Sequence, residues 1–132
     1  MNKIEHIGIA VADIESAIIK WEKLLGTSCY KRERVESQKV ETAFFLMGES
    51  KIELLGATSP DSVIATYIAK KGEGMHHIAY DVEDIYKSMK ELSEQGFQLL
   101  STEPSKGADN KLVAFFHPKT VDGVLTEICQ SI

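Results

Sequence analysis

The sequence predicts an α+β fold made of paired βαβββ modules, and three observations lead to that prediction. First, the chain repeats itself, because residues 4–14 and 75–85 align at a constant offset with a histidine, an aspartate and three aliphatic residues identical. Second, the same offset aligns residues 43–45 with 114–116, and both segments read Ala-Phe-Phe. Third, in each repeat the spacing of apolar residues changes from every second residue to a helical spacing, as expected for a strand followed by a helix. Two related structural units are the simplest explanation of such a repeat.

The first half of the chain is interpreted as a strand, a helix and three further strands. β-Branched residues alternate with others over residues 4–11, which is typical of a strand. Asp13 is then placed to cap a helix, apolar residues follow at helical spacing, and Gly26 ends that helix. The apolar segments that remain predict strands near 28–36, 39–47 and 51–55.

The second half repeats this pattern after a connecting helix. Pro60 lies at the start of the connecting helix, which is expected to run through Lys70. Asp84 caps the next helix and Gly96 ends it. Strands are expected at 97–102, 111–117 and 123–130. We therefore expect one domain over residues 1–132, with module one at 1–56, a linker helix at 57–72 and module two at 73–132. Each module leaves one sheet face uncovered, so the two are expected to pack around a shared cavity.

The composition excludes several classes of protein. The chain has 132 residues, of which 43% are hydrophobic and 27% charged, as in an ordinary globular domain. A formal net charge of −5 argues against a nucleic-acid-binding module, which is usually basic. No apolar run is long enough for a membrane span, and the first residues do not form a signal-peptide pattern. The two cysteines form no disulfide framework, so we expect free thiols and a cytoplasmic protein.

Two histidines occupy corresponding positions in the opening strands of the two halves. His6 shares its strand face with the small residues Gly8 and Ala10, and His77 shares its face with Ala79. The larger aliphatic residues take the opposite face, where they can pack against the helices. The histidine face of each strand therefore has room for another group.

Two glutamates, Glu53 and Glu127, occupy corresponding positions in the closing strands. A carboxylate inside an apolar strand is costly to bury unless it is paired or binds a cation. Taken singly, a strand histidine is more often a core residue and a strand glutamate more often faces solvent. Because the repeat couples all four positions, we predict a metal site made of His6, Glu53, His77 and Glu127. Two imidazoles and two carboxylates suit Co, Ni, Mn or Zn, and an octahedral ion would keep two positions for water or substrate.

The pattern resembles the vicinal oxygen chelate (glyoxalase I-like) superfamily and, within it, the methylmalonyl-CoA epimerase family. The resemblance implies paired βαβββ modules in a vicinal oxygen chelate fold around a metal cavity, the same four metal ligands, an acyl-CoA substrate and a homodimer. It assigns the ligand role to His77, the repeat partner of His6, and a structural role to His76. The segments that carry the resemblance span most of the chain: residues 6–11, 48–55, 71–79, 114–119 and 123–127.

The reaction that the resemblance implies is interconversion of (2R)- and (2S)-methylmalonyl-CoA by removal of the C2 proton, with the metal stabilising the enolate. The family lets the glutamate at the position of Glu127 take that proton. In some relatives a glutamate on the module's second strand is the other base, and Glu41 is the candidate here. However, the alignment of the Ala-Phe-Phe segments puts Thr42 at that position, and a shift of one residue reverses the strand face. An exposed strand glutamate is the alternative interpretation of Glu41.

Lysines gather in the segment from Pro104 to Lys119, although the chain as a whole is acidic. We expect Lys106 and Lys119 to help bind the phosphates of CoA, and an ordinary solvated loop is the alternative. The main alternative function is that of lactoylglutathione lyase (glyoxalase I), which has a similar fold and ligand set. Residues 117–123 resemble the epimerase pattern instead. A metal-free binding protein would lack the ligands, and an iron dioxygenase would use two histidines and one carboxylate.

Overall fold

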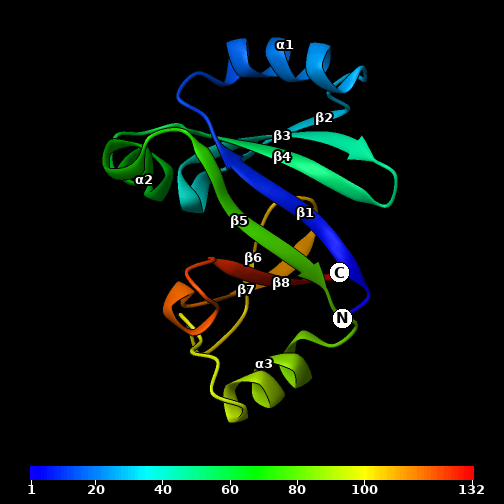
Figure 1. The fold of residues 1–132 in the computed structure, drawn as a ribbon, viewed down its shortest axis with the longest axis vertical. Helices are drawn as coiled ribbons and strands as arrows, with labels where there is room; N and C mark the ends of the chain where they lie inside the picture. Colours follow the sequence, from blue (N-terminus) through cyan, green and yellow to red (C-terminus); the bar gives the residue numbers. More distant parts are fainter. The chain divides into compact units, whose positions relative to one another are not determined.

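The computed structural model describes residues 1–132, which divide into two compact units (Figure 1). Residues 7–76 form the N-terminal unit, and residues 1–6 together with 77–132 form the C-terminal unit. Strands β1 (Lys3–Ala10) and β5 (Gly74–Asp81) each contribute residues to both units. The beginning of the chain is therefore part of the unit formed mainly by its second half. The module boundaries expected near residues 56 and 73 stay a prediction.

The N-terminal unit has an antiparallel sheet covered on one face by a helix. Helix α1 (Ile14–Leu25) begins where the Asp13 carboxylate accepts hydrogen bonds from two backbone N–H groups of the first turn, and it ends at Gly26, whose φ is 68°. Both predicted ends are confirmed. Figure 1 shows α1 lying along one face of the strands that follow it. Those elements are β2 (Lys31–Val35), the short 3₁₀ helix η1 (Glu36–Gln38), β3 (Val40–Met47) and β4 (Ser50–Ala57), with β3 pairing antiparallel to both β2 and β4.

Alternate residues of β3 and β4 belong to different apolar clusters, and this assigns their two faces. Ala43, Phe45 and Leu54 pack with the apolar side of α1. Val40 and Leu55 instead form a cluster with residues of helix α2 (Val63–Lys71). The predicted start of α2 at Pro60 was wrong. The helix begins after Ser62 because the Ser62 hydroxyl accepts a hydrogen bond from the backbone N–H of Ala65 at 3.0 Å, as a preferred N-cap residue does.

The C-terminal unit has a four-stranded arrangement in the order β5-β8-β7-β6. Strand β8 runs parallel to β5 and antiparallel to β7, and β6 is antiparallel to β7. The core consists of Ile85 and Met89 of helix α3 packed on Ala114, Phe116 and Ile128 of the strands. The bounds are α3 (Ile85–Glu94), β6 (Ser105–Lys106), β7 (Lys111–Phe116), the 3₁₀ helix η2 (Pro118–Thr120) and β8 (Thr126–Ser131).

Two strand predictions in this unit were wrong in extent. Residues 97–102 form no strand, and only Leu99 makes an isolated bridge to Phe116. Two backbone hydrogen bonds still join this segment to residues 115–117, from the His117 N–H to the Gln98 carbonyl at 2.7 Å and from the Leu100 N–H to the Phe115 carbonyl at 2.9 Å. The Gln98 N–H donates to the Thr120 hydroxyl oxygen at 3.2 Å. Strand β8 begins at Thr126 rather than 123 because a turn precedes it, in which Gly123 has a φ of 84°. None of the helices is long and apolar enough to span a membrane.

Candidate metal centre

Two imidazole nitrogens and one carboxylate oxygen, from three different strands, meet in the C-terminal unit. The Nε2 atoms of His6 and His77 are 3.1 Å apart. Glu127 Oε1 lies 3.3 Å from His77 Nε2 and 3.6 Å from His6 Nε2. The two imidazole rings stand edge to face, with an interplanar angle of 87°. Three of the four predicted ligands are therefore brought together at one point.

Strand register places two of these ligands. Strands β5 and β8 are parallel neighbours in which Ala79 pairs with Glu127. His77 lies two residues before Ala79, so both side chains leave the same face of β5. The Ala79 side chain is small and fully buried, and it packs with Cys129 of β8. The His77 ring is further supported by an edge-to-face contact with the Phe115 ring, at 5.7 Å between centroids.

The donor set and its spacing fit a divalent transition metal. His6, His77 and Glu127 are only 6%, 4% and 4% exposed, so their lone pairs are withdrawn from bulk water. A buried carboxylate against two imidazoles is costly unless a cation is shared among them. Ligand atoms at about 2.1 Å from an ion and at right angles to one another would be about 3 Å apart. The observed distances of 3.1–3.6 Å are close to that value, so the residues fit the metal that the sequence predicts.

A fourth buried group, Glu5, contacts the His6 ring at its other nitrogen, and the sequence did not predict it. Glu5 is 2% exposed, and its Oε1 lies 3.3 Å from Nδ1 of His6. Its Oε2 lies 3.8 Å from the Nζ of Lys111, which donates a hydrogen bond to the Ser131 hydroxyl at 2.7 Å. The available signal was a charged residue directly before a proposed ligand in an otherwise apolar strand.

Glu53 belongs to the N-terminal unit, where it is 5% exposed in β4 and pairs with Phe44 of β3. Its neighbours Ile52 and Leu54 pack with the α1 cluster, whereas Leu55 belongs to the cluster on the other face. Glu53 therefore points to the face away from α1, because successive side chains of a strand alternate between its two faces. Its role as a metal ligand stays a prediction.

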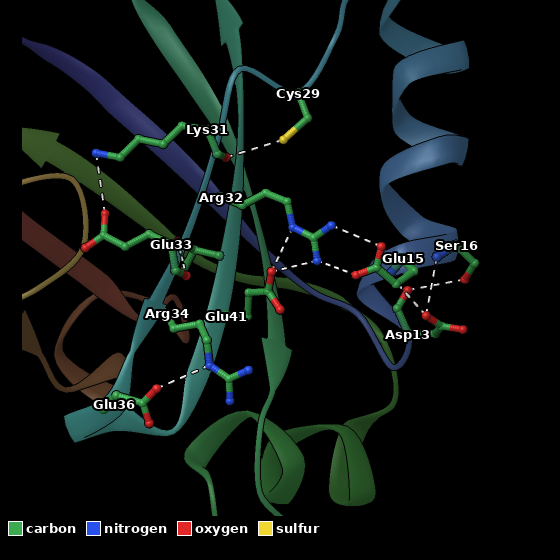
Figure 2. Close-up of polar contacts among 11 residues, drawn as sticks. Asp13, Glu15, Ser16, Cys29, Lys31, Arg32, Glu33, Arg34, Glu36 and Glu41 are labelled. Atoms are coloured by element: carbon green, nitrogen blue, oxygen red, sulfur yellow. Dashed lines mark hydrogen bonds and ion pairs between the residues drawn. The ribbon is translucent and has the colours of Figure 1, made fainter.

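Glu41, the candidate second base, lies on the face of β3 that is covered by α1. Figure 2 shows the Arg32 guanidinium between the Glu41 carboxylate and Glu15 of helix α1, whereas Lys31 and Glu33 point away from that helix. The Arg32 Nε donates to Glu41 Oε2 at 2.7 Å, and the same guanidinium binds both carboxylate oxygens of Glu15. Thr42 leaves the opposite face, is 1% exposed and donates to the Glu33 carbonyl at 3.3 Å. The catalytic role of Glu41 stays a prediction, and the pairing of Glu41 with Arg32 does not favour it.

The cluster around Arg32 is an ion network in which one guanidinium is shared by two carboxylates. The hydrogen bonds that Arg32 donates to Glu15 and Glu41 raise the pKa of Arg32 above its ordinary value. The same guanidinium lowers the pKa of Glu15 below its ordinary value. Each carboxylate here faces a permanent cation supplied by the chain. The network therefore stabilises charge that is already present rather than preparing a site for another ion.

The remaining candidates lie in separate places. Lys106 is exposed in β6 and Lys119 is exposed in η2, and their role in phosphate binding stays a prediction. The His76 ring packs edge to face on Tyr67 at 4.8 Å, and burial lowers the pKa of His76. Both cysteines are free thiols, as expected, and burial raises the pKa of Cys129 far above its ordinary value.

Comparisons with known proteins agree with this architecture. Residues 5–115 match the family model of the glyoxalase/bleomycin resistance protein/dioxygenase superfamily. The uncharacterized protein YqjC of Bacillus subtilis is 41% identical over 130 residues, covering 98% of this chain and 93% of that protein. Human mitochondrial methylmalonyl-CoA epimerase is 35% identical over 132 residues, covering 99% of this chain and 75% of that protein.

A solved structure gives the same result. A variant of Streptomyces coelicolor methylmalonyl-CoA epimerase in complex with 2-nitronate-propionyl-CoA superimposes with a TM-score of 0.95 and 33% identity, covering 99% of this chain and 95% of that chain. The predicted glyoxalase-like α+β fold is therefore confirmed. The human and Streptomyces coelicolor relatives, both methylmalonyl-CoA epimerases by name, are isomerases.

Proposed function

Because this chain belongs to the glyoxalase/bleomycin resistance protein/dioxygenase superfamily, and within it to the methylmalonyl-CoA epimerase family, we propose that it interconverts (2R)- and (2S)-methylmalonyl-CoA. The observation that carries the proposal is the buried convergence of His6 Nε2, His77 Nε2 and Glu127 Oε1, no two of which are more than 3.6 Å apart. The acyl-CoA analogue bound by the Streptomyces coelicolor relative supports the class of substrate.

A divalent metal ion, Co, Ni, Mn or Zn, is the proposed cofactor. His6, His77 and Glu127 would hold it, with Glu53 as the fourth ligand on the strength of its burial and its repeat correspondence with Glu127. When bound, such an ion acts as a Lewis acid that stabilises negative charge developing on the thioester and carboxylate oxygens of the substrate. Neutral imidazoles and ionised carboxylates are the forms in which these side chains bind metals.

The protein's own part in the reaction is to move a proton at C2 of the substrate. Glu127 is the proposed base, because its carboxylate is buried and directed to the same point as both imidazoles. A base within hydrogen-bond reach of the substrate C–H accelerates such a step about 10²–10⁴-fold. Return of a proton to the opposite face completes the epimerisation. Glu41 is the sequence-based candidate for that second step, and its Arg32 partner supports a structural role instead.

Substrate binding, assembly and location complete the proposal. Lys106 and Lys119 are proposed to contact the CoA phosphates, since both ammonium groups are on exposed residues. We also propose a homodimer in the cytoplasm, which sedimentation and fractionation would test.

The experiment that tests the function is an exchange assay on metal-defined protein. Metal-stripped protein is reloaded separately with Co, Ni, Mn or Zn and incubated with one epimer of methylmalonyl-CoA in heavy water. Metal-dependent appearance of the other epimer, with deuterium at C2, is expected. Glu83→Gln, an exposed change outside the site, is the matched control for Glu127→Gln. Turnover of the methylglyoxal–glutathione hemithioacetal without epimerisation would replace the proposal with glyoxalase I activity.

A further inference from the structure

The buried carboxylate of Glu5 contacts Nδ1 of the His6 ring. Glu5 Oε1 lies 3.3 Å from His6 Nδ1, while the opposite ring nitrogen, Nε2, faces His77 and Glu127. A neutral imidazole carries one N–H and one lone pair, and the partner of one nitrogen decides which nitrogen holds the proton. A carboxylate at Nδ1 favours the N–H there, which leaves the Nε2 lone pair for the converging site.

The other side of the Glu5 carboxylate is balanced by Lys111. Oε2 of Glu5 is 3.8 Å from Lys111 Nζ, and the side chains are only 3% and 11% exposed. Lys111 is itself held by its hydrogen bond to Ser131 Oγ. Strand β7 therefore supplies a cation to a carboxylate on β1, and both charged groups are largely withdrawn from solvent.

We propose that Glu5 is a positioning residue for the metal centre, which fixes His6 with its proton on Nδ1 and its Nε2 lone pair directed toward the ion. Lys111 holds the Glu5 carboxylate in the orientation that this requires. The inference rests on the proposed function, because it assumes that His6 binds a metal through Nε2. Carboxylate partners of metal-binding histidines typically contribute 10–100-fold to metal affinity.

A second metal site at the same place is the rival interpretation, since Glu5, His6 and Cys129 also have ligand atoms close together. The Cys129 thiol, however, is fully buried and donates to the Tyr80 carbonyl at 3.6 Å. That hydrogen bond directs the thiol to the backbone of β5. The acidic side chain therefore acts on His6 as a hydrogen-bond acceptor rather than as a ligand of another ion.

The test separates metal affinity from folding with three variants of the full chain: Glu5→Gln, Lys111→Met and the double variant E5Q/K111M. Removing one member of a buried pair is expected to destabilise the fold, whereas removing both charges restores much of the stability. The thermal midpoint of metal-free protein should therefore fall in each single variant and recover in the double variant. The Kd for Co²⁺, measured by competition with a chromophoric chelator, should be raised 10-fold or more in both variants that lack Glu5.

The outcomes are distinguishable. A double variant that folds and binds Co²⁺ as tightly as the unmodified chain would overturn the positioning role and leave the proposed function intact. Failure of the unmodified chain to bind any of the four metals would overturn both. Glu83→Gln serves as the control and should leave the Kd and the thermal midpoint unchanged. Loss of affinity that persists in the stable double variant is the result that supports the inference.

Discussion

The cluster around Arg32 and the cluster of His6, His77 and Glu127 both contain buried or half-buried carboxylates, but only the first contains a permanent cation. In the N-terminal unit, Arg32 is placed between Glu15 and Glu41, so each acceptor meets a donor from the same chain (Figure 2). In the C-terminal unit, two imidazole nitrogens and a carboxylate oxygen, from His6, His77 and Glu127, meet within 3.1–3.6 Å with no permanent cation among them. The first cluster is partly exposed and the second is buried.

This difference indicates which cluster has a function beyond folding. An exposed ion network contributes little to stability and can be replaced with little effect. Burying a carboxylate against two imidazoles destabilises the fold unless the groups are paired or bind a cation. Such groups are therefore often found where a cation or a substrate binds. Each of the following variants tests one side of that comparison.

The largest expected effect comes from Glu127→Gln. An amide cannot accept the C2 proton, so kcat for epimerisation should fall about 10³-fold. Deuterium incorporation at C2, followed by mass spectrometry, measures the loss. The assay should be run with the metal content of the variant determined, because the same side chain is a proposed ligand. A metal-loaded variant that retains more than a tenth of the exchange rate would remove Glu127 from the role of base.

The adjacent histidines allow a sharper comparison within one strand. His77→Asn removes an atom that lies 3.1 Å from His6 Nε2, and Co²⁺ affinity should fall at least 10-fold. His76→Asn removes only a ring packed on Tyr67 and should leave the affinity unchanged. Competition with a chromophoric chelator measures both. Equal loss of affinity in the two variants would contradict the assignment of His77 as the ligand.

Much of this site could be predicted because the repeat couples its residues. His6 and His77 occupy corresponding positions in the two repeats, and so do Glu53 and Glu127. The clusters of neighbouring apolar residues show that Glu53 lies on the same strand face as Leu55, and Glu127 on the same face as Cys129. The pairing of Glu41 with Arg32 could not be predicted, because it depends on which face of β3 is covered by α1.

The contact between Glu5 and Lys111 could not be predicted from the sequence either. These residues are far apart along the chain, on β1 and β7, and meet only through tertiary packing. The same holds for residues 97–102, where the Gln98 N–H donates to the Thr120 side chain and only a single bridge, Leu99 to Phe116, forms. Local periodicity gives the elements and their faces, whereas partners from distant elements decide such details.

A smaller effect is expected at the exposed lysines. The double variant of Lys106→Ala and Lys119→Ala should raise KM for methylmalonyl-CoA several-fold and leave kcat unchanged, because the ammonium groups would contact phosphates remote from C2. Steady-state kinetics at two salt concentrations measure this, since attraction between exposed charges is screened by salt. Lys87→Ala, which removes an exposed lysine of α3, is the control. An unchanged KM in the double variant would contradict the proposed role.

The smallest effect is expected from Glu41→Gln, the variant that most directly tests the cluster around Arg32. Arg32 keeps Glu15 as a partner, so the urea midpoint should move by no more than about 0.5 M. The rate of C2 exchange should stay within two-fold of the unmodified chain, because Glu41 faces Arg32 and α1. Glu15→Gln, which removes the other carboxylate of the cluster, is the matched control. A 100-fold loss of exchange in the Glu41 variant alone would restore Glu41 as the second base, and would mean that Arg32 orients a catalytic group rather than neutralising a structural one.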